Sequence, residues 1–407
     1  MHSRDETLER VTPLRHTRTM THALRALALL SLSSFACGGS TSSNSSPDAA
    51  SDDGGTIVEG GMSDATCGAP RTTCTGACVD TSSDATNCGR CNHSCAQGAT
   101  CSASACVYDT GSSVVLAIKK LYLGDSDRNG VQNLNAWKDY GANLDGKTTD
   151  RNSTDVCTLI AGASRSTQVD GTNGIDNSFG ENILPIWLTT AGFMFSQQVN
   201  DAISMGTASS TILRIEGVTA QPDASPAAGS IFIGAPFGSP PKWDGRDIWP
   251  VDSASVSGGD IKMPALAFAN GAMANRVWTG APPAAGANLP LLFVGDEQVL
   301  ISDVKISMTI AADGRSSVLG TIAGVMPTEA YIAAMKKAAG RISTSLCQGS
   351  ALDSLAQQIR QASDILRDGS NIAGVPCDAI SIGIGFDATI VRLGEIVTPA
   401  APPNPCP

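Results

Sequence analysis

Apolar and polar positions alternate along several short runs in the second half of the chain. The runs span 210–218, 230–235, 289–295, 297–310, 316–325 and 379–396. Alternation with a period of two is typical of half-buried strands, and Gly, Asp or Pro separates most of the runs. The pattern therefore predicts a β-rich domain over residues 110–407.

Two helical patterns interrupt this series of strands. In residues 327–340, Thr328 is expected to cap a helix with Glu329 in its first turn and Lys336 and Lys337 in its last. In residues 350–369, Ser350 and Asp353 form a capping-box pattern and Gly369 is expected to end the helix. A third helix is predicted near residues 200–206.

These patterns predict a mainly β (α+β) fold. We expect an antiparallel β-sandwich-like domain with an inserted helical pair, preceded by a small disulfide-rich module. Strands and helices do not alternate regularly, which argues against a Rossmann fold or a βα barrel.

The N-terminal region has the organisation of an export signal. Basic residues precede a short apolar run at 23–36, so residues 1–36 are predicted to be a signal peptide, with Met20 as an alternative start. The letters SFAC at 34–37 resemble a bacterial lipobox, which implies that Cys37 is lipidated. The alternative is an ordinary secretory signal with an incidental cysteine. Residues 37–66 would then be the lipidated Cys37 and a Ser/Gly/Asp linker too polar to fold.

Composition narrows the classes of function. The chain has 407 residues, a net charge of −11 and 13 cysteines. An acidic chain argues against a nucleic-acid partner, and so many cysteines argue against a reducing compartment unless they bind metal. The four histidines are His2, His16, His22 and His93, so residues 110–407 contain none. A Ser-His-Asp triad, a Cys-His pair and a His-ligated zinc hydrolase are therefore excluded in that domain.

Residues 67–108 form a region that we call the cysteine module. Its eight cysteines are Cys67, Cys74, Cys78, Cys88, Cys91, Cys95, Cys101 and Cys106. With almost no large apolar residues nearby, four disulfides are expected in place of a hydrophobic core. Zinc is the alternative, because Cys88, Cys91, His93 and Cys95 are ligand types at plausible spacing.

The spacing of these cysteines resembles the stigma-specific cysteine-rich family. The family pattern C-x-G-x-C-V-D matches residues 74–80, N-C-G-x-C matches 87–91, and a C-x2-G-x2-C stretch falls on Cys95, Gly98 and Cys101. Such modules occur in secreted plant proteins and in lipoproteins of myxobacterial type. The resemblance covers about residues 67–107. It implies an extracellular recognition or spacer module without known catalysis, and it leaves the main domain unrecognised.

Four cysteines remain in the main domain, and they allow three pairings. We expect Cys347–Cys377, which would bracket a predicted helix, and Cys157–Cys406, which would tie the ends of the domain. Lipidation of Cys37 would then leave no unpaired thiol.

Residues 125–136 resemble the first half of a calcium-binding loop. The candidate ligands of a structural calcium ion are Asp125, Asp127, Asn129, Val131 and Asn133. Position 12 of the loop is Ala136, so the bidentate acid is missing. Asp170, Asn173 and Asp176 form a similar turn-rich stretch. The alternative is that these are Asp/Asn/Gly turns bonding their own backbone.

Other motifs are weaker. Residues 141–148 match the phosphate-loop pattern, but no strand pattern precedes them and no helix follows, so we expect a Gly-rich turn and no nucleotide. The S-x-x-K spacing at 302–305 lies in a predicted strand.

A glycan hydrolase with a pair of catalytic acids remains an open interpretation. The candidate acids are Glu181, Glu216, Glu297 and Glu395. Trp243 and Trp249 are candidate ligand residues for a sugar or protein partner, and the alternative is that they pack on the sheet.

These observations favour an exported, lipid-anchored protein of the outer membrane or cell surface. Its expected role is non-catalytic binding or interaction, with the membrane reached through the acyl anchor and an extracellular protein or glycan as partner. No cofactor is required. The alternatives are an extracellular carboxylate-dependent glycan hydrolase and a purely structural envelope protein.

Overall fold

The computed structural model describes residues 67–68, 70–95, 99–108, 113–191, 195–218, 221–280, 288–294, 297–342 and 346–400. They comprise the cysteine module and most of the β-rich domain. Cys37, Cys406 and the predicted signal peptide and linker lie outside these residues. No helix in the described part of the chain combines the length and apolar character needed to cross a bilayer.

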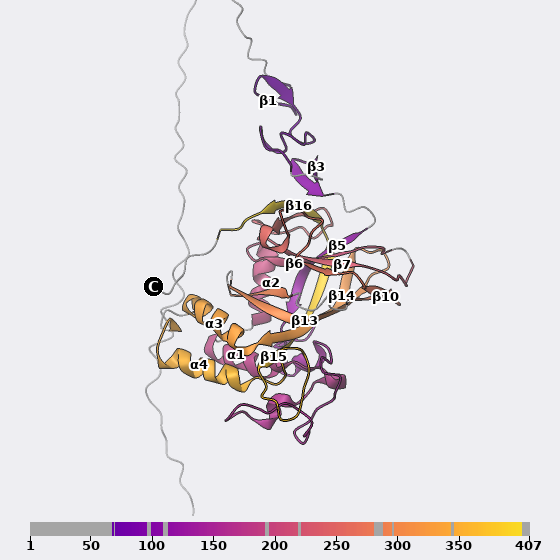
Figure 1. The fold of residues 1–407 in the computed structure, drawn as a ribbon. Coiled ribbons are helices and arrows are strands. Elements are labelled where there is room, and N and C mark those ends of the chain that lie inside the picture. The colour runs from indigo at the N-terminus through magenta and orange to yellow at the C-terminus, as the bar shows by residue number, and fades with distance from the viewer. Residues whose placement is uncertain are drawn as a thin grey trace, which may run out of the picture. The chain divides into compact units, whose positions relative to one another are not determined.

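The β-rich domain is built on one curled sheet of twelve strands (Figure 1). Its path runs through β10 (Ala272–Ala274), β11 (Val277–Gly280), β13 (Glu297–Ile310), β14 (Ser316–Pro327), β15 (Ala379–Ile390), β5 (Val114–Tyr122), β6 (Ser210–Ile215), β7 (Gly229–Gly234), β8 (Ile248–Asp252) and β16 (Arg392–Val397), with β12 (Leu289–Val294) beside β13 and β9 (Leu266–Phe268) beside β7. Strands β8 and β16 pair in parallel, and the long neighbours β13, β14 and β15 are antiparallel. The mainly β class with inserted helices is confirmed.

Most of the predicted strands are present, with one important difference at the C-terminal end. The run 379–396 is divided between β15 and β16, because the N–H of Val391 donates to the carbonyl of Val115 and turns the chain toward β8. The sequence pattern also missed β5, which lies between β15 and β6.

The first half of strand β5 has no polar face, because both sides of the sheet are covered there. Leu116 and Ile118 belong to the larger apolar core, whereas Val115 and Ala117 belong to a smaller core on the other side of the strand. A strand buried on both faces reads as a continuous apolar run and loses the alternation that identifies half-buried strands.

Helices α1 (Leu184–Ala191), α3 (Thr328–Ile342) and α4 (Ser350–Gln361) contribute to the larger core, and α2 (Phe195–Met205) contains the predicted third helix (Figure 1). Trp187 of α1 donates from its indole N–H to the Tyr331 hydroxyl of α3 at 3.1 Å. Leu352 and Leu355 place α4 against the same core. The expected helical pair before the last strands is therefore α3 and α4.

Both predicted ends of α4 need correction. Gly349 is the N-cap residue of α4. Ser350 is therefore the first helical residue, and its side chain does not cap the helix. The helix ends at Gln361, well before Gly369. Beyond that point Asp364 accepts a hydrogen bond from the N–H of Ser381 at 2.8 Å, which holds the chain beside β15.

Both expected disulfides of the main domain are wrong. Cys157 is joined to Cys377, with Cα atoms 5.2 Å apart. Cys347 is also disulfide-bonded, and Cys377 is not its partner. The residues next to Cys157 and Cys377 form a short parallel bridge between Thr158 and Pro376, which brings the two sulfurs together.

Candidate functional site

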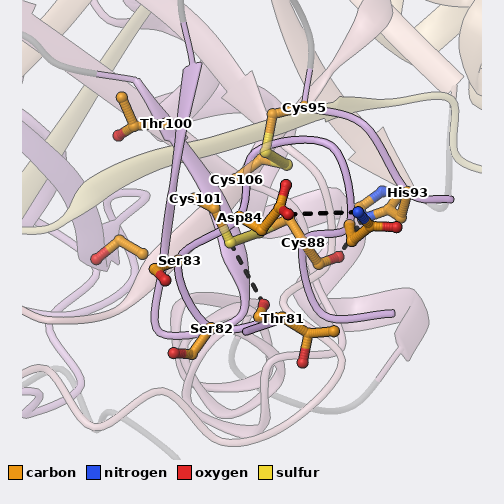
Figure 2. Close-up of a disulfide and its surroundings, with 12 residues drawn as sticks. Thr81, Ser82, Ser83, Asp84, Cys88, His93, Cys95, Thr100, Cys101 and Cys106 are labelled. Atoms are coloured by element: carbon orange, nitrogen blue, oxygen red, sulfur yellow. Dashed lines mark hydrogen bonds between the residues drawn. A yellow bond between two sulfur atoms is a disulfide. The ribbon is translucent and has the colours of Figure 1, made fainter. Parts of the chain in front are cut away.

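The cysteine module consists of two small hairpins and four disulfides. The hairpins are β1 (Thr72–Cys74) with β2 (Ala77–Val79), and β3 (Ala99–Ser102) with β4 (Ala105–Tyr108). The disulfides are Cys67–Cys78, Cys74–Cys91, Cys88–Cys101 and Cys95–Cys106. Figure 2 shows the last two of these pairs and their surroundings. The prediction that all eight cysteines form disulfides is confirmed.

Several non-cysteine positions of the family pattern have clear structural roles. Asp80 accepts a hydrogen bond from the N–H of Ser82 at 2.9 Å and so fixes the turn after β2. Asn87 accepts from the N–H of Asn92 at 2.9 Å. Gly89 has φ +74, and a Cβ there would lie 2.6 Å from the carbonyl oxygen of Ser104. A side chain at Gly89 would therefore collide with the backbone between β3 and β4.

The disulfides remove the zinc alternative. Sulfur atoms of Cys88, Cys95 and Cys106 lie close enough together to resemble a metal site. All three are already oxidised to disulfides, however, and a zinc ligand must be a free thiolate. The same argument applies to the group of His93, Cys106 and Glu395, which retains only two donors once Cys106 is excluded.

The module contacts the last strand of the main domain. Nε2 of His93 lies 3.1 Å from a carboxylate oxygen of Glu395 on β16. Arg392, on the same strand, donates to the Ser102 hydroxyl at 3.4 Å, and Ala99 packs against the smaller core. A cavity of about 400 Å³ lies beside these contacts, lined by residues of the module such as Arg90 and by β8 and β16.

The calcium-loop candidates have other bonding partners. Both carboxylate oxygens of Asp125 accept from Ser196, which lies in α2. Asp127 accepts from the backbone N–H groups of Asn129 and Val131, each at 2.9 Å. The carbonyl of Val131 accepts from the N–H of Asp127, and Asn133 caps the following turn at Asn135. This bonding favours the interpretation in which the residues stabilise their own turn.

The two tryptophans occupy different environments. Trp249 is fully buried in the smaller core, and its indole N–H donates to the carbonyl of Ala235 at 2.9 Å. Trp243 is half-buried, with its ring centroid 5.3 Å from that of Trp249. The packing alternative therefore describes Trp249, whereas Trp243 packs against the same core and is partly exposed.

The phosphate-loop match is a structural turn. Lys147 donates to the carbonyl of Asn371 at 2.8 Å and forms an ion pair with Asp155 at 3.0 Å. Lys305, from the S-x-x-K spacing, lies in β13 and donates to the carbonyls of Asn143 and Leu144, each at 3.0 Å. Both lysines therefore tie the loop to the rest of the domain.

A group of acids gathers around this loop. Burial raises the pKa of Asp176 to about 7, helped by repulsion from Asp145 and Asp170. Burial also raises the pKa of Glu181 to about 7, and one carboxylate oxygen of Glu181 is buried without a hydrogen-bond partner. Burial raises the pKa of Asp364 well above its ordinary value, although Ser381 donates to it twice. Burial thus favours the neutral form of all three carboxyl groups.

Two of the other candidate glutamates have partners elsewhere. Glu216 pairs with Arg214 at 3.5 Å, Glu395 pairs with His93, and Glu297 lies in β13. Neither the cavity beside the module nor the apolar cavity of about 470 Å³ between α1 and α4 is lined by Asp176 or Glu181. A glycosidase needs two acids across a sugar-binding cleft, and these cavities do not supply that arrangement.

Comparison with known proteins supports the assignment of the module. Residues 48–109 match the stigma-specific STIG1-like protein family. The resemblance seen in the cysteine spacing is thereby confirmed for this part of the chain. Comparison with curated proteins and with solved structures gives no match. The β-rich domain consequently remains unrecognised.

Sequence reasoning missed the contact between His93 and Glu395 and the group of acids around Asp176. No motif links these residues, since Asp176 and Asp364 belong to distant segments. The usable signals were indirect. His93 is the lone histidine beyond the first 22 residues, and the stretch 170–177 was already singled out for its acids.

Proposed function

We propose that this chain is an exported, lipid-anchored protein of the outer membrane or cell surface with a non-catalytic binding role. The observation that carries the proposal is the state of the cysteines: all eleven within the described residues are disulfide-bonded. Disulfides persist in oxidising compartments and are rare where glutathione keeps thiols reduced. The lipobox-like SFAC before residue 38 supports attachment through Cys37.

The arrangement of parts suits presentation of a folded domain outside the cell. An acyl chain on Cys37 would hold the protein to a membrane, and the polar linker would separate it from the cysteine module. The module would serve as a stalk or recognition element, and the β-rich domain would bind an extracellular protein or glycan. Trp243 is the part of the predicted ligand site that remains partly exposed.

Fractionation and intact mass test the anchor directly. The natural protein should be recovered with membranes, cut before Cys37, with a mass that shows acylation and no free thiols. Cys37→Ser should move it to the soluble fraction while the disulfides remain. Recovery from the cell interior with the N-terminal segment uncut and free thiols would overturn the proposal.

One observation favours the hydrolase alternative. Glu181 has the raised pKa that a general acid needs, and one of its oxygens is buried and unpaired. The purified protein should be screened for release of sugars from envelope glycans. Turnover that Glu181→Gln abolishes and the control Glu216→Gln retains would replace the binding role with catalysis. Retention of glycan without turnover supports binding.

A further inference from the structure

Both ring nitrogens of His93 face atoms that accept hydrogen bonds. Nδ1 lies 2.6 Å from the backbone oxygen of Cys88, and Nε2 lies 3.1 Å from a carboxylate oxygen of Glu395. A neutral imidazole carries a single N–H and can donate to one of these partners. The other nitrogen would then place a lone pair against an oxygen. Only the protonated ring donates to both.

The two acceptors belong to different parts of the protein. The carbonyl of Cys88 lies within the module, whose disulfides fix it in place (Figure 2). Glu395 lies on β16, at the end of the large sheet. The charge on His93 therefore acts on the contact between the module and the domain.

Two guanidinium groups lie near this contact. Arg90 of the module lines the same cavity as His93 and Glu395. Arg392 on β16 donates to the Ser102 hydroxyl at 3.4 Å, at the long end of the hydrogen-bond range. Without the proton on His93, the module keeps this bond, the packing of Ala99 and the contact of β4 with β16.

We propose that protonation of His93 seats the cysteine module on strand β16, and that loss of the proton loosens it. The side chains of His93 and Glu395 are 23% and 46% exposed, so protons exchange with solvent without unfolding. Histidine is the side chain whose ordinary titration falls between pH 5 and 8. A protein outside the cell meets the pH of its surroundings, and this contact would make the position of the module depend on it.

Hydrogen exchange measured on the exported chain with its disulfides intact tests the proposal. Backbone protection of residues 392–397, corrected for the intrinsic pH dependence of exchange, should fall as pH rises from 5 to 8. We expect a change of about two- to fivefold, as for a partly exposed ion pair. His93→Gln and Glu395→Gln should each remove this dependence, and the double variant should behave like either single variant. Nitrogen NMR of the ring should show both nitrogens of His93 protonated at pH 5.

A matched control separates this effect from the acids of the main domain. Glu216→Gln removes the charge of another acid, one paired with Arg214, and should leave the pH dependence at β16 intact. Protection of β13–β15 reports the domain as a whole and should be unaffected by His93→Gln. Protection of β16 that is independent of pH in the parent, or unchanged by His93→Gln, would overturn the proposal. A ring of His93 with one protonated nitrogen at pH 5 would do so as well.

Discussion

Cys157 and Cys377 lie 220 residues apart in the sequence, yet a disulfide joins them. The bond is buried, and Gln168 donates to the carbonyl of Cys157 at 2.8 Å beside it. The connection fixes the long loop region after β5 to the segment that leads into β15. It therefore constrains the acids around Asp176 as well as the fold.

Removing this disulfide should destabilise the domain without changing its fold. The variant with both Cys157→Ser and Cys377→Ser should lose roughly 2–5 kcal/mol of unfolding free energy, because the unfolded chain regains a large closed loop. Urea denaturation without reductant measures the loss. Reduction of all disulfides should largely abolish the difference between parent and variant. An unchanged midpoint would contradict the structural role of the bond.

Asp176 should make the domain less stable as pH rises through neutrality. Its carboxyl has a folded-state pKa of about 7, above the ordinary value of 3.8, so its contribution is fully present below about 4 and is lost as pH rises through 7. One pKa unit corresponds to ~1.4 kcal/mol, so the rise from 3.8 to about 7 corresponds to a loss of roughly 4 kcal/mol over the full range, most of it between pH 5 and 8. Denaturation between pH 5 and 8 measures it. Asp176→Asn should make the profile less steep, because Glu181 and Asp364 keep their own raised pKa values. The exposed Asp201→Asn should leave the profile unchanged, and equal profiles for all three proteins would refute the assignment.

The two tryptophans should respond differently to truncation. Trp249→Ala should cost about 3–5 kcal/mol of unfolding free energy, because the ring is fully buried and its N–H is bonded. Trp243→Ala should cost distinctly less, since that ring is half-buried. Thermal unfolding compares them. If a glycan binds at this surface, it should alter the fluorescence of the parent protein, and Trp243→Phe should remove that change although four tryptophans remain. Similar losses from both truncations would show that Trp243 is also core.

Lys305 should stabilise the turn that matches the phosphate-loop pattern. Lys305→Met removes a cation that donates to two backbone carbonyls and should cost about 1–3 kcal/mol. Lys336→Met, at an exposed position of α3, is the matched control and should be nearly neutral. Calorimetry with ATP should show no binding to the parent protein, because Lys147 is held by Asp155 and Asn371. Saturable binding of ATP would restore the nucleotide interpretation.

Local sequence determined the features that depend on nearby residues. The spacing of eight cysteines in the module specified a disulfide framework, because the stretch has almost no apolar residues with which to build a core. The alternation of apolar and polar residues identified β13 with its observed boundaries, because the two faces of a half-buried strand differ in polarity. The absence of histidine from residues 110–407 excluded the catalytic sites that need an imidazole in that domain.

Tertiary structure decided the features that depend on distant residues. Alternation could not reveal β5, because Leu116 and Val115 are buried on opposite faces. Spacing could not pair Cys157 with Cys377, because disulfide partners are chosen by the distance between Cα atoms in the fold. The meeting of His93 with Glu395 has the same origin. Such contacts arise from the path of the whole chain, which no local pattern encodes.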